Sequence, residues 1–223
     1  MPHAGVLIGF EGGEGCGKTT QARRLQEFLL AEGYPVVLTR EPGGTRLGER
    51  IREVLLRGDD ELGAREEFLL FSTARSQLVR DVIAPALAAG DIVLVDRYYY
   101  SSYAYQGGGG GLPREFMELV TAGVVAGCVP DLVVLLDLEP AVGLERRRQE
   151  CGRDRTASDR FERKGLDFHR RVRDAFLGLA RAEPERFLVL DAGSTAEDIA
   201  ATVRGRVLQL LAARGFQPGG RRL

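Results

Sequence analysis

The sequence predicts an α/β fold in three layers, with a five-stranded parallel sheet flanked by helices. Five short segments rich in Val, Ile and Leu are nearly continuous apolar runs, which is typical of strands buried on both faces. These segments alternate with longer stretches in which apolar residues recur at helical spacing. Strands that alternate with helices favour right-handed crossovers and therefore a parallel sheet.

The predicted strands follow the buried apolar runs in chain order. Ligands of open parallel sheets collect at the carboxyl ends of the strands. Glycines or charged residues follow each of the first three strands, where a simple turn would be enough. The predicted strands are residues 5–11, 35–39, 91–96, 131–138 and 187–191.

Helical spacing predicts seven helices between and after these strands, and the rest of the chain is less regular. The five-glycine run 107–111 is expected to be mobile, because ordering glycine has a high entropic cost. The polar, arginine-rich stretch 150–158 is also expected to be mobile. Residues 1–216 are predicted to form one domain, with 217–223 as a flexible tail. The predicted helices are residues 18–31, 47–56, 65–88, 114–126, 141–149, 160–182 and 196–213.

Composition excludes several classes of protein. The chain has 223 residues, is 44% hydrophobic and has a formal net charge of -1, which argues against binding to nucleic acid or to a membrane surface. It has neither an apolar run of about 18 residues nor a signal peptide pattern. Cys16, Cys128 and Cys151 are too widely spaced for a disulfide framework or a zinc site. A reducing cytoplasmic location is therefore expected.

A phosphate-binding loop follows the first strand. Its sequence matches G-x-x-x-x-G-K-[ST] between a strand and a helix. Its main-chain N–H groups and the following helix N-terminus suit a polyphosphate. Lys18 is one of only two lysines among 31 basic residues; it is predicted to reach the β- and γ-phosphates, and Thr19 to bind Mg²⁺. The loop predicts binding of a nucleoside triphosphate by Gly12, Gly13, Glu14, Gly15, Cys16, Gly17, Lys18, Thr19 and Thr20.

This loop indicates a P-loop NTPase-type fold, in which a carboxylate at the end of a neighbouring strand lies near the metal. Asp96 ends the third predicted strand and is therefore a candidate metal ligand with Thr19. Two alternatives for Asp96 are a helix N-cap and an ion pair with Arg97.

Several further motifs carry a resemblance to bacterial thymidylate kinases, in order along nearly the whole chain. The resemblance implies phosphorylation of dTMP to dTDP by Mg·ATP in dTTP synthesis, and a homodimer. The motifs are Phe10-Glu11-Gly12-x-Glu14-Gly15-x-Gly17-Lys18-Thr19-Thr20, Thr39-Arg40-Glu41-Pro42-Gly43-Gly44-Thr45, Asp96-Arg97-Tyr98, Ser101-Ser102-x-Ala104-Tyr105-Gln106-Gly107 and Pro130-Asp131-Leu132.

The resemblance also implies a thymine site. Phe71 and Arg75 are four residues apart on a predicted helix; Phe71 would stack on the base and Arg75 would donate to O4. Spacing alone favours a core Phe71 and a solvated Arg75. Ser102 and Gln106 would lie beside the base edge and Tyr105 under the sugar, although core packing would also explain Tyr105.

The acceptor phosphate is expected to contact arginines, whose planar guanidinium makes paired bonds to phosphate. The resemblance implies Arg52 and Arg97 for this role. It also places Glu14 near the sugar 3′-hydroxyl or a phosphate-binding arginine. The remaining substrate-binding residues that it implies are Glu41, Pro42, which the resemblance suggests follows a cis bond, and Ser101.

A lid around residues 148–160 is expected to supply one more arginine to the transferred phosphoryl group. Some related sequences carry an arginine where this chain has Gly15. In this chain another arginine, from the lid, is therefore expected to neutralise the charge on the transferred phosphoryl group. Arg160 has the best motif placement, followed by Arg153 and Arg148; a solvated charge run is the alternative. The predicted catalytic residues are Lys18, Arg97, Arg160, Arg153 and Glu14.

Other functions fit the motifs less well. A UMP/CMP kinase is the nearest alternative enzyme. A deoxynucleoside kinase would need a base to activate a neutral 5′-hydroxyl, where this chain has Asp96-Arg97-Tyr98. A GTPase switch would need a guanine-reading N-K-x-D motif, which the sequence lacks.

Overall fold

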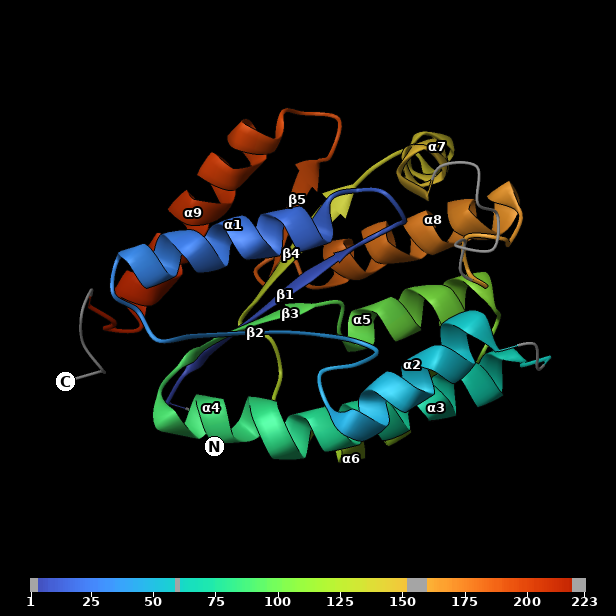
Figure 1. Ribbon diagram of the computed structural model, residues 1–223, viewed down its shortest axis with the longest axis horizontal. Helices are drawn as coiled ribbons and strands as arrows, with labels where there is room; N and C mark the ends of the chain where they lie inside the picture. The colour runs from blue at the N-terminus through green and yellow to red at the C-terminus, as the bar shows by residue number, and fades with distance from the viewer. Residues whose placement is uncertain (1–3, 59–60, 152–159, 218–223) are drawn as a thin grey trace.

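The strands form one five-stranded parallel sheet in the order β2-β3-β1-β4-β5 (Figure 1). The computed structural model describes residues 4–58, 61–151 and 160–217. The predicted fold class is confirmed, and each strand lies within a residue of its predicted bounds. The strands are β1 (Val6–Gly12), β2 (Val36–Arg40), β3 (Ile92–Asp96), β4 (Leu132–Asp137) and β5 (Phe187–Asp191).

The sheet has a hydrophobic core on each face because successive side chains of a strand point to opposite sides. In β1, Val6, Ile8 and Phe10 pack with residues of α1 (Lys18–Ala31) and α9 (Ala196–Ala213). Leu7 points to the other core. Figure 1 shows α1 and α9 on one side of the sheet, and α3 (Ala64–Leu78), α4 (Ala84–Ala89) and α6 (Arg114–Val125) on the other.

The helices of the second face lie between β2 and β5 in the sequence. Two more helices pack against this layer. Helix α2 (Arg46–Arg57) packs on α3 through Ile51, Leu55 and Ala74, and α7 (Pro140–Cys151) packs on α8 (Leu166–Ala182). The elements of the second face are α3 (Ala64–Leu78), η1 (Val79–Ile83), α4 (Ala84–Ala89), α5 (Tyr99–Ser102), η2 (Tyr103–Gly109), α6 (Arg114–Val125) and α8 (Leu166–Ala182), where η marks π-helical turns.

The helix predicted over residues 65–88 is interrupted by the π-helical segment η1. Pro85 follows directly at the start of α4. Proline lacks the N–H that an α-helical turn would use, and widened turns accommodate such positions. The chain nevertheless continues in one direction as far as Gly90, whose left-handed backbone ends the helix.

The helix predicted over residues 160–182 begins only at Leu166, so its first turn and a half was wrongly placed. Gly165 is the N-cap, with an extended backbone. Residues 160–165 form turns instead, with the Lys164 N–H donating to the Phe161 carbonyl. Glycine disfavours a helix interior, and the turn lets Phe161 and Lys164 pack toward α3 and α8.

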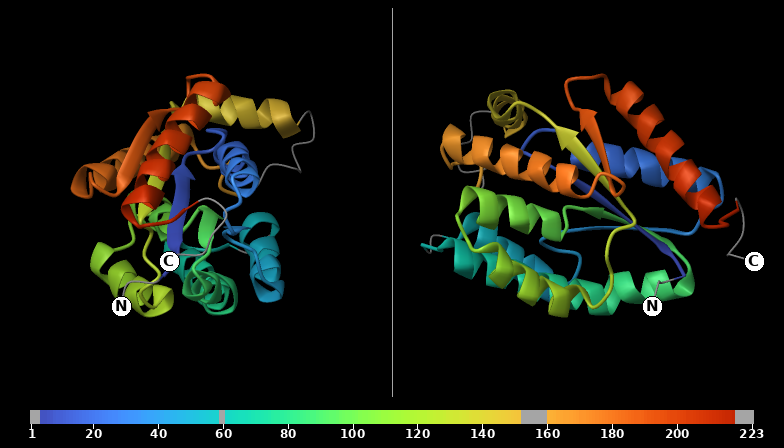
Figure 2. Two further views of the ribbon diagram at one scale, coloured as in Figure 1. Left: turned by 90° about the vertical axis from the view of Figure 1, so that its left-hand side faces the viewer. Right: turned by 180° about the vertical axis from the view of Figure 1, so that it is seen from behind.

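The glycine run 107–111 is ordered, so the expectation of mobility was wrong, and the helix over 99–109 was not predicted as such. The run packs against α8 (Figure 2, right). A Cβ on Gly108 would lie 2.4 Å from the Ala175 Cβ, and one on Gly109 would lie 2.5 Å from the Phe168 ring. Arg171 donates to the Gly109 carbonyl at 3.0 Å. The glycines remain ordered because α8 approaches their backbone too closely for side chains.

The arginine-rich stretch 150–158 and the C-terminal tail are only partly covered by the structure. Residues 150 and 151 end α7, whereas 152–159, including Arg153, and 218–223 lie outside the described residues. Cys16 and Cys128 are free and buried. In the described part of the chain, no helix has the length and hydropathy needed to cross a membrane.

Candidate functional site

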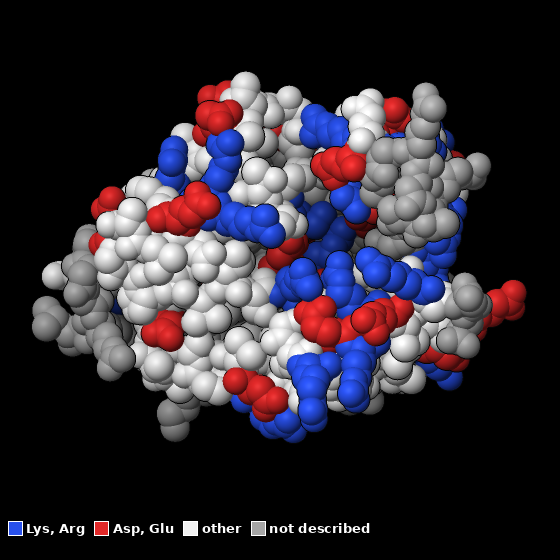
Figure 3. Space-filling view, viewed as in Figure 1, with Lys and Arg blue, Asp and Glu red and all other residues white. Residues whose placement is uncertain are grey.

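A cavity of about 450 Å³ opens at the carboxyl ends of the central strands. Figure 3 shows Lys and Arg side chains gathered around a hollow on this face, with acidic side chains among them. All predicted substrate-binding residues line this cavity. Its lining includes Glu14, Gly15, Gly17, Lys18, Thr19, Thr20, Arg40, Glu41, Pro42, Arg52, Phe71, Arg75, Asp96, Arg97, Ser101, Ser102, Tyr105, Gln106, Arg147, Glu150, Phe161 and Glu162.

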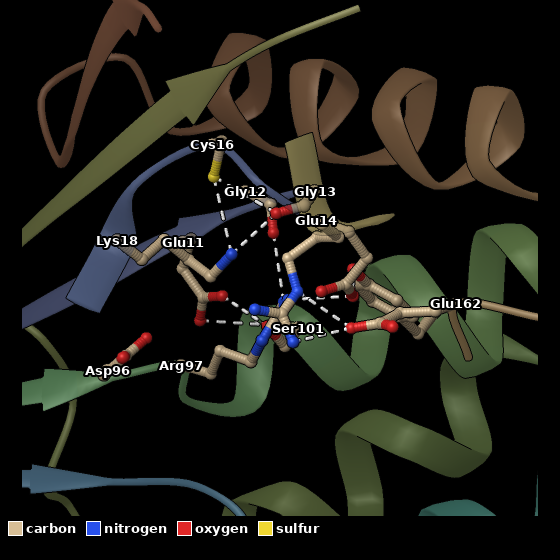
Figure 4. A network of polar contacts seen from close by, with 12 residues as sticks. Glu11, Gly12, Gly13, Glu14, Cys16, Lys18, Asp96, Arg97, Ser101 and Glu162 are labelled. Carbon is tan, nitrogen blue, oxygen red and sulfur yellow. Dashed lines mark hydrogen bonds and ion pairs between the residues drawn. The ribbon is translucent and has the colours of Figure 1, made fainter. Parts of the chain in front are cut away.

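The glycine-rich loop between β1 and α1 forms one wall. Gly12, Gly15 and Gly17 have positive φ angles, which glycine adopts at little cost. The Lys18 ammonium donates to the Gly13 carbonyl at 2.6 Å and lies 3.4 Å from the Cys16 sulfur (Figure 4). The loop therefore has the curled backbone, the lysine and the helix N-terminus that a polyphosphate requires.

The first turns of α7 press against this loop. A Cβ on Gly15 would lie 2.2 Å from the carbonyl oxygen of Gly143, and one on Gly143 would lie 2.1 Å from that of Glu14. No side chain fits between them. An arginine is therefore excluded at position 15 by packing in this chain.

The two candidate metal ligands lie together. Thr19 comes from the first turn of α1 and Asp96 from the end of β3, and the Thr19 hydroxyl donates to the Asp96 carboxylate at 2.5 Å. Hydroxyl and carboxylate oxygens are the ligands that Mg²⁺ prefers. The pair lies beside the phosphate-binding loop, so these residues fit a nucleotide-bound magnesium ion.

Arg97 lies at the centre of the cavity wall, with its backbone in the left-handed region at φ 67°. Its guanidinium donates to the Gly12 carbonyl at 3.0 Å and to Glu14 at 2.9 Å. Glu14 also accepts the hydroxyl of Tyr105 at 2.6 Å. Glu14 is therefore next to Arg97, the arginine that the resemblance assigns to the acceptor phosphate.

The charge state of Glu14 follows from these neighbours. Burial by itself raises the pKa of the Glu14 carboxyl. The guanidinium of Arg97 and the ammonium of Lys18 outweigh burial and lower the pKa to about 2. Glu14 is therefore a carboxylate at neutral pH, and it holds the Arg97 guanidinium in the cavity.

A second buried carboxylate, Glu11, holds the backbone that follows Arg97. It accepts the Tyr98 N–H at 2.8 Å and the Ser101 hydroxyl at 2.5 Å. Burial raises the pKa of Glu11 to about 7, although the bonds from Ser101 and Tyr98 and the charges of Arg97 and Lys18 oppose the shift. Glu11 was not predicted as a site residue, because its partners Tyr98 and Ser101 are distant in the sequence and the residues next to it do not indicate them.

The far end of the cavity holds Phe71, Arg75, Ser102 and Gln106. Arg75 is 1% exposed, so it is not the solvated charge that spacing alone favoured. Its Nε donates to Glu41 at 2.7 Å and its Nη2 to the Ser102 hydroxyl at 3.0 Å. Phe71, half-buried, has its ring 5.9 Å from that of Phe161.

Arg52 and Pro42 lie on the same side of the cavity. The Glu41–Pro42 bond is cis, as the family resemblance suggested. The Arg52 guanidinium donates to the Pro42 carbonyl at 3.0 Å. The loop after β2 therefore presents Arg52 to the cavity, with Glu41 directed to Arg75.

The predicted lid arginines take different places. Arg160 does not line the central cavity: its guanidinium donates to the Gly58 carbonyl at 2.7 Å, at the end of α2. Arg148 is exposed and pairs with Glu145. Arg147 lines the cavity and pairs with Glu162 at 2.8 Å. The sequence shows Arg147 only as the middle of an arginine run, because the direction of α7 decides which member faces inward.

Fold and site together define a class of protein. One cavity at the carboxyl edge of a parallel sheet is lined at one end by the glycine-rich loop and at the other end by arginines. This is the arrangement of a P-loop α/β protein that binds two anionic ligands near each other.

Comparison with known proteins identifies the family. Residues 10–203 match the family model described as thymidylate kinase. The chain is 52% identical over 199 residues to thymidylate kinase of Deinococcus radiodurans, covering 89% of this chain and 94% of that one. It is 49% identical over 209 residues to thymidylate kinase of Clavibacter sepedonicus, covering 94% and 97%. The crystal structure of thymidylate kinase from Ehrlichia chaffeensis superposes with a TM-score of 0.71 at 31% identity, covering 93% and 98%.

The chain therefore belongs to the thymidylate kinase family, and it is an enzyme that phosphorylates dTMP. The resemblance seen in the sequence is confirmed.

Proposed function

We propose that Mg·ATP is the phosphoryl donor and that each nucleotide occupies one end of the cavity. The observation that carries this proposal is the common cavity shared by Lys18 of the phosphate-binding loop and Arg97. ATP would lie along residues 12–20, with Mg²⁺ held by Thr19 and Asp96. The thymine would lie between Phe71 and Arg75.

The side chains of the site position the two nucleotides and neutralise the negative charge of their phosphates. The metal supplies charge neutralisation at the donor phosphates when it is bound. Lys18 and the loop N–H groups hold the donor phosphates, while Arg97 and Arg52 hold the acceptor phosphate. No general base is required, because a phosphate monoester oxygen is already a nucleophile near neutral pH.

Three further parts of the proposal concern the whole chain. We propose one domain over residues 1–216, with a lid around 148–160 that closes over the donor and supplies an arginine. Arg160, Arg153 and the inward-facing Arg147 are the candidates for this arginine.

We also propose a cytoplasmic homodimer whose contact is formed by α3 and α6, since Leu119 of α6 is 77% exposed and Leu69 of α3 is 42% exposed.

The test is a steady-state assay of ATP-dependent phosphorylation with dTMP, dUMP, dCMP and dGMP as acceptors. We expect dTMP to have the highest kcat/KM, and Arg97→Ala to lower kcat/KM for dTMP by about 100-fold or more with little change in ATP binding. Equal loss of dTMP use and ATP binding would contradict the acceptor role of Arg97. Equal use of dTMP and dCMP would contradict the thymine site.

A further inference from the structure

A buried carboxylate next to the cavity has no role in the mechanism above. Glu67 of α3 is 1% exposed. One of its oxygens accepts the Lys164 ammonium at 3.0 Å and the other accepts the side-chain amide of Gln106 at 3.0 Å. Lys164 lies 4.8 Å and 4.6 Å from the ring centroids of Phe161 and Phe168. A carboxylate buried so deeply needs such partners to offset its desolvation.

The contact with Glu67 determines how the Gln106 amide is turned. A carboxylate accepts hydrogen bonds, so the Gln106 Nε2 must face it and the Oε1 must face away. This Oε1 is buried and has no hydrogen-bond partner among the described residues. Gln106 lines the cavity. The carbonyl of Gln106 is therefore an acceptor without a partner, held in one orientation.

Arg75 supplies the complementary group in the same wall. Its Nε and Nη2 are bound to Glu41 and Ser102, whereas its Nη1 is buried and lacks a partner within the described part of the chain. Ser102 is four residues before Gln106, on the same helical stretch. Since leaving a buried polar group unpaired is unfavourable, the free donor and the free acceptor both point to a bound partner.

The free donor of Arg75 and the free acceptor of Gln106 complement the hydrogen-bonding groups along one edge of a pyrimidine base. Thymine and uracil present an acceptor, O4, next to a donor, N3–H. Cytosine presents the reverse, an amino donor next to the acceptor N3. A guanidinium can only donate, but an amide can turn by 180° and offer its NH₂ group to cytosine instead.

We propose that Glu67 is a specificity-determining positioning residue, which prevents the Gln106 amide from turning and so excludes cytosine. Lys164, on the turn before α8, compensates the charge of Glu67. The inference rests on the proposed function, because it requires the base to lie beside Arg75 and Gln106. It adds that discrimination depends on a residue behind the cavity wall.

The test is Glu67→Gln, which keeps the shape but allows the side chain to donate as well as accept. We expect the ratio of kcat/KM for dTMP to that for dCMP to fall about tenfold. The ratio of dTMP to dUMP is expected to stay the same, since uracil presents the same edge. Glu66→Gln, one residue earlier and exposed, is the matched control and should change neither ratio.

A merely structural role would lower kcat/KM for dTMP and dCMP together, and that result would overturn the proposal. Gln106→Met provides a second route, which also applies if Glu67→Gln does not fold: it should lower the dTMP/dCMP ratio by a similar factor. In the double variant, Glu67→Gln should add no further change, because it acts through Gln106. An unchanged ratio in Gln106→Met would overturn the proposal.

The wild-type assay separates this inference from the proposed function. If the wild-type enzyme shows no preference for dTMP over dCMP, the thymine site itself fails. If it prefers dTMP and Glu67→Gln retains that preference, only the role of Glu67 fails.

Discussion

Arg97 combines an unfavourable backbone with a buried charge, and its neighbours account for both. A left-handed backbone at a non-glycine residue costs on the order of 1–3 kcal/mol. Glu11 holds the following turn through the Tyr98 N–H and Ser101, and Glu14 holds the guanidinium. The arginine is therefore fixed before any ligand arrives, which reduces the entropy lost on binding a phosphate.

The Glu14–Arg97 pair predicts how stability changes with pH. The folded-state pKa of Glu14, about 2, lies below the ordinary value of 4.5 for a glutamate. Its contribution is therefore fully present above pH 4.5 and is lost as the pH falls toward 2. We expect Glu14→Gln to lower the free energy of unfolding by about 3 kcal/mol at neutral pH.

The difference between wild type and Glu14→Gln should narrow as the pH falls from 4.5 toward 2. Chemical denaturation at a series of pH values measures it. A difference that stays constant over this range would show that Glu14 titrates normally in the folded protein. Glu66→Gln is the control at an exposed position.

At the scale of elements, the contact between η2 and α8 places the side chains of Tyr105 and Gln106. Gly108 and Gly109 allow α8 to approach the backbone of η2, and Arg171 donates to the Gly109 carbonyl. The glycines thus order the helix that carries part of the proposed base site. This is why a composition rule based on glycine entropy failed here.

Gly108→Ala tests this contact, because the new Cβ would lie 2.4 Å from that of Ala175. We expect a loss of about 1–3 kcal/mol in the free energy of unfolding, measured by denaturant titration. Ala175→Gly in the same chain should recover part of the loss by removing the obstructing atom. Gly123→Ala in α6 should not destabilise the protein, because its new Cβ would have no atom within 4 Å apart from the neighbouring backbone of its own helix. Equal stability of Gly108→Ala and wild type would refute close packing.

At the scale of the whole molecule, the proposed dimer depends on apolar side chains that one chain leaves exposed. Leu119 is 77% exposed on α6, on the second face of the sheet. We expect light scattering to give a dimer mass for wild type and a monomer mass for Leu119→Arg. Leu208→Arg on α9, over the opposite face, should remain a dimer. A monomeric wild type would contradict the proposal.

The parallel sheet, the phosphate-binding loop and the family could all be predicted from the order of the residues. Buried strands are continuous apolar runs, and the loop from Gly12 to Thr19 is contiguous, so both patterns are complete within a short stretch of chain. The prediction was weaker for helix starts, as at Leu166, because competing turns depend on what the segment packs against.

Which charged side chains are buried, and which partners they face, became visible only in the folded chain. Arg75 and Glu67 look like exposed helix charges until Glu41, Ser102, Gln106 and Lys164 are brought around them from distant segments. The same applies to Arg147, which is distinguished from its neighbours by the direction of α7. Hydrogen-bond pairing and desolvation depend on distances between residues far apart in the chain, and a linear pattern does not contain those distances.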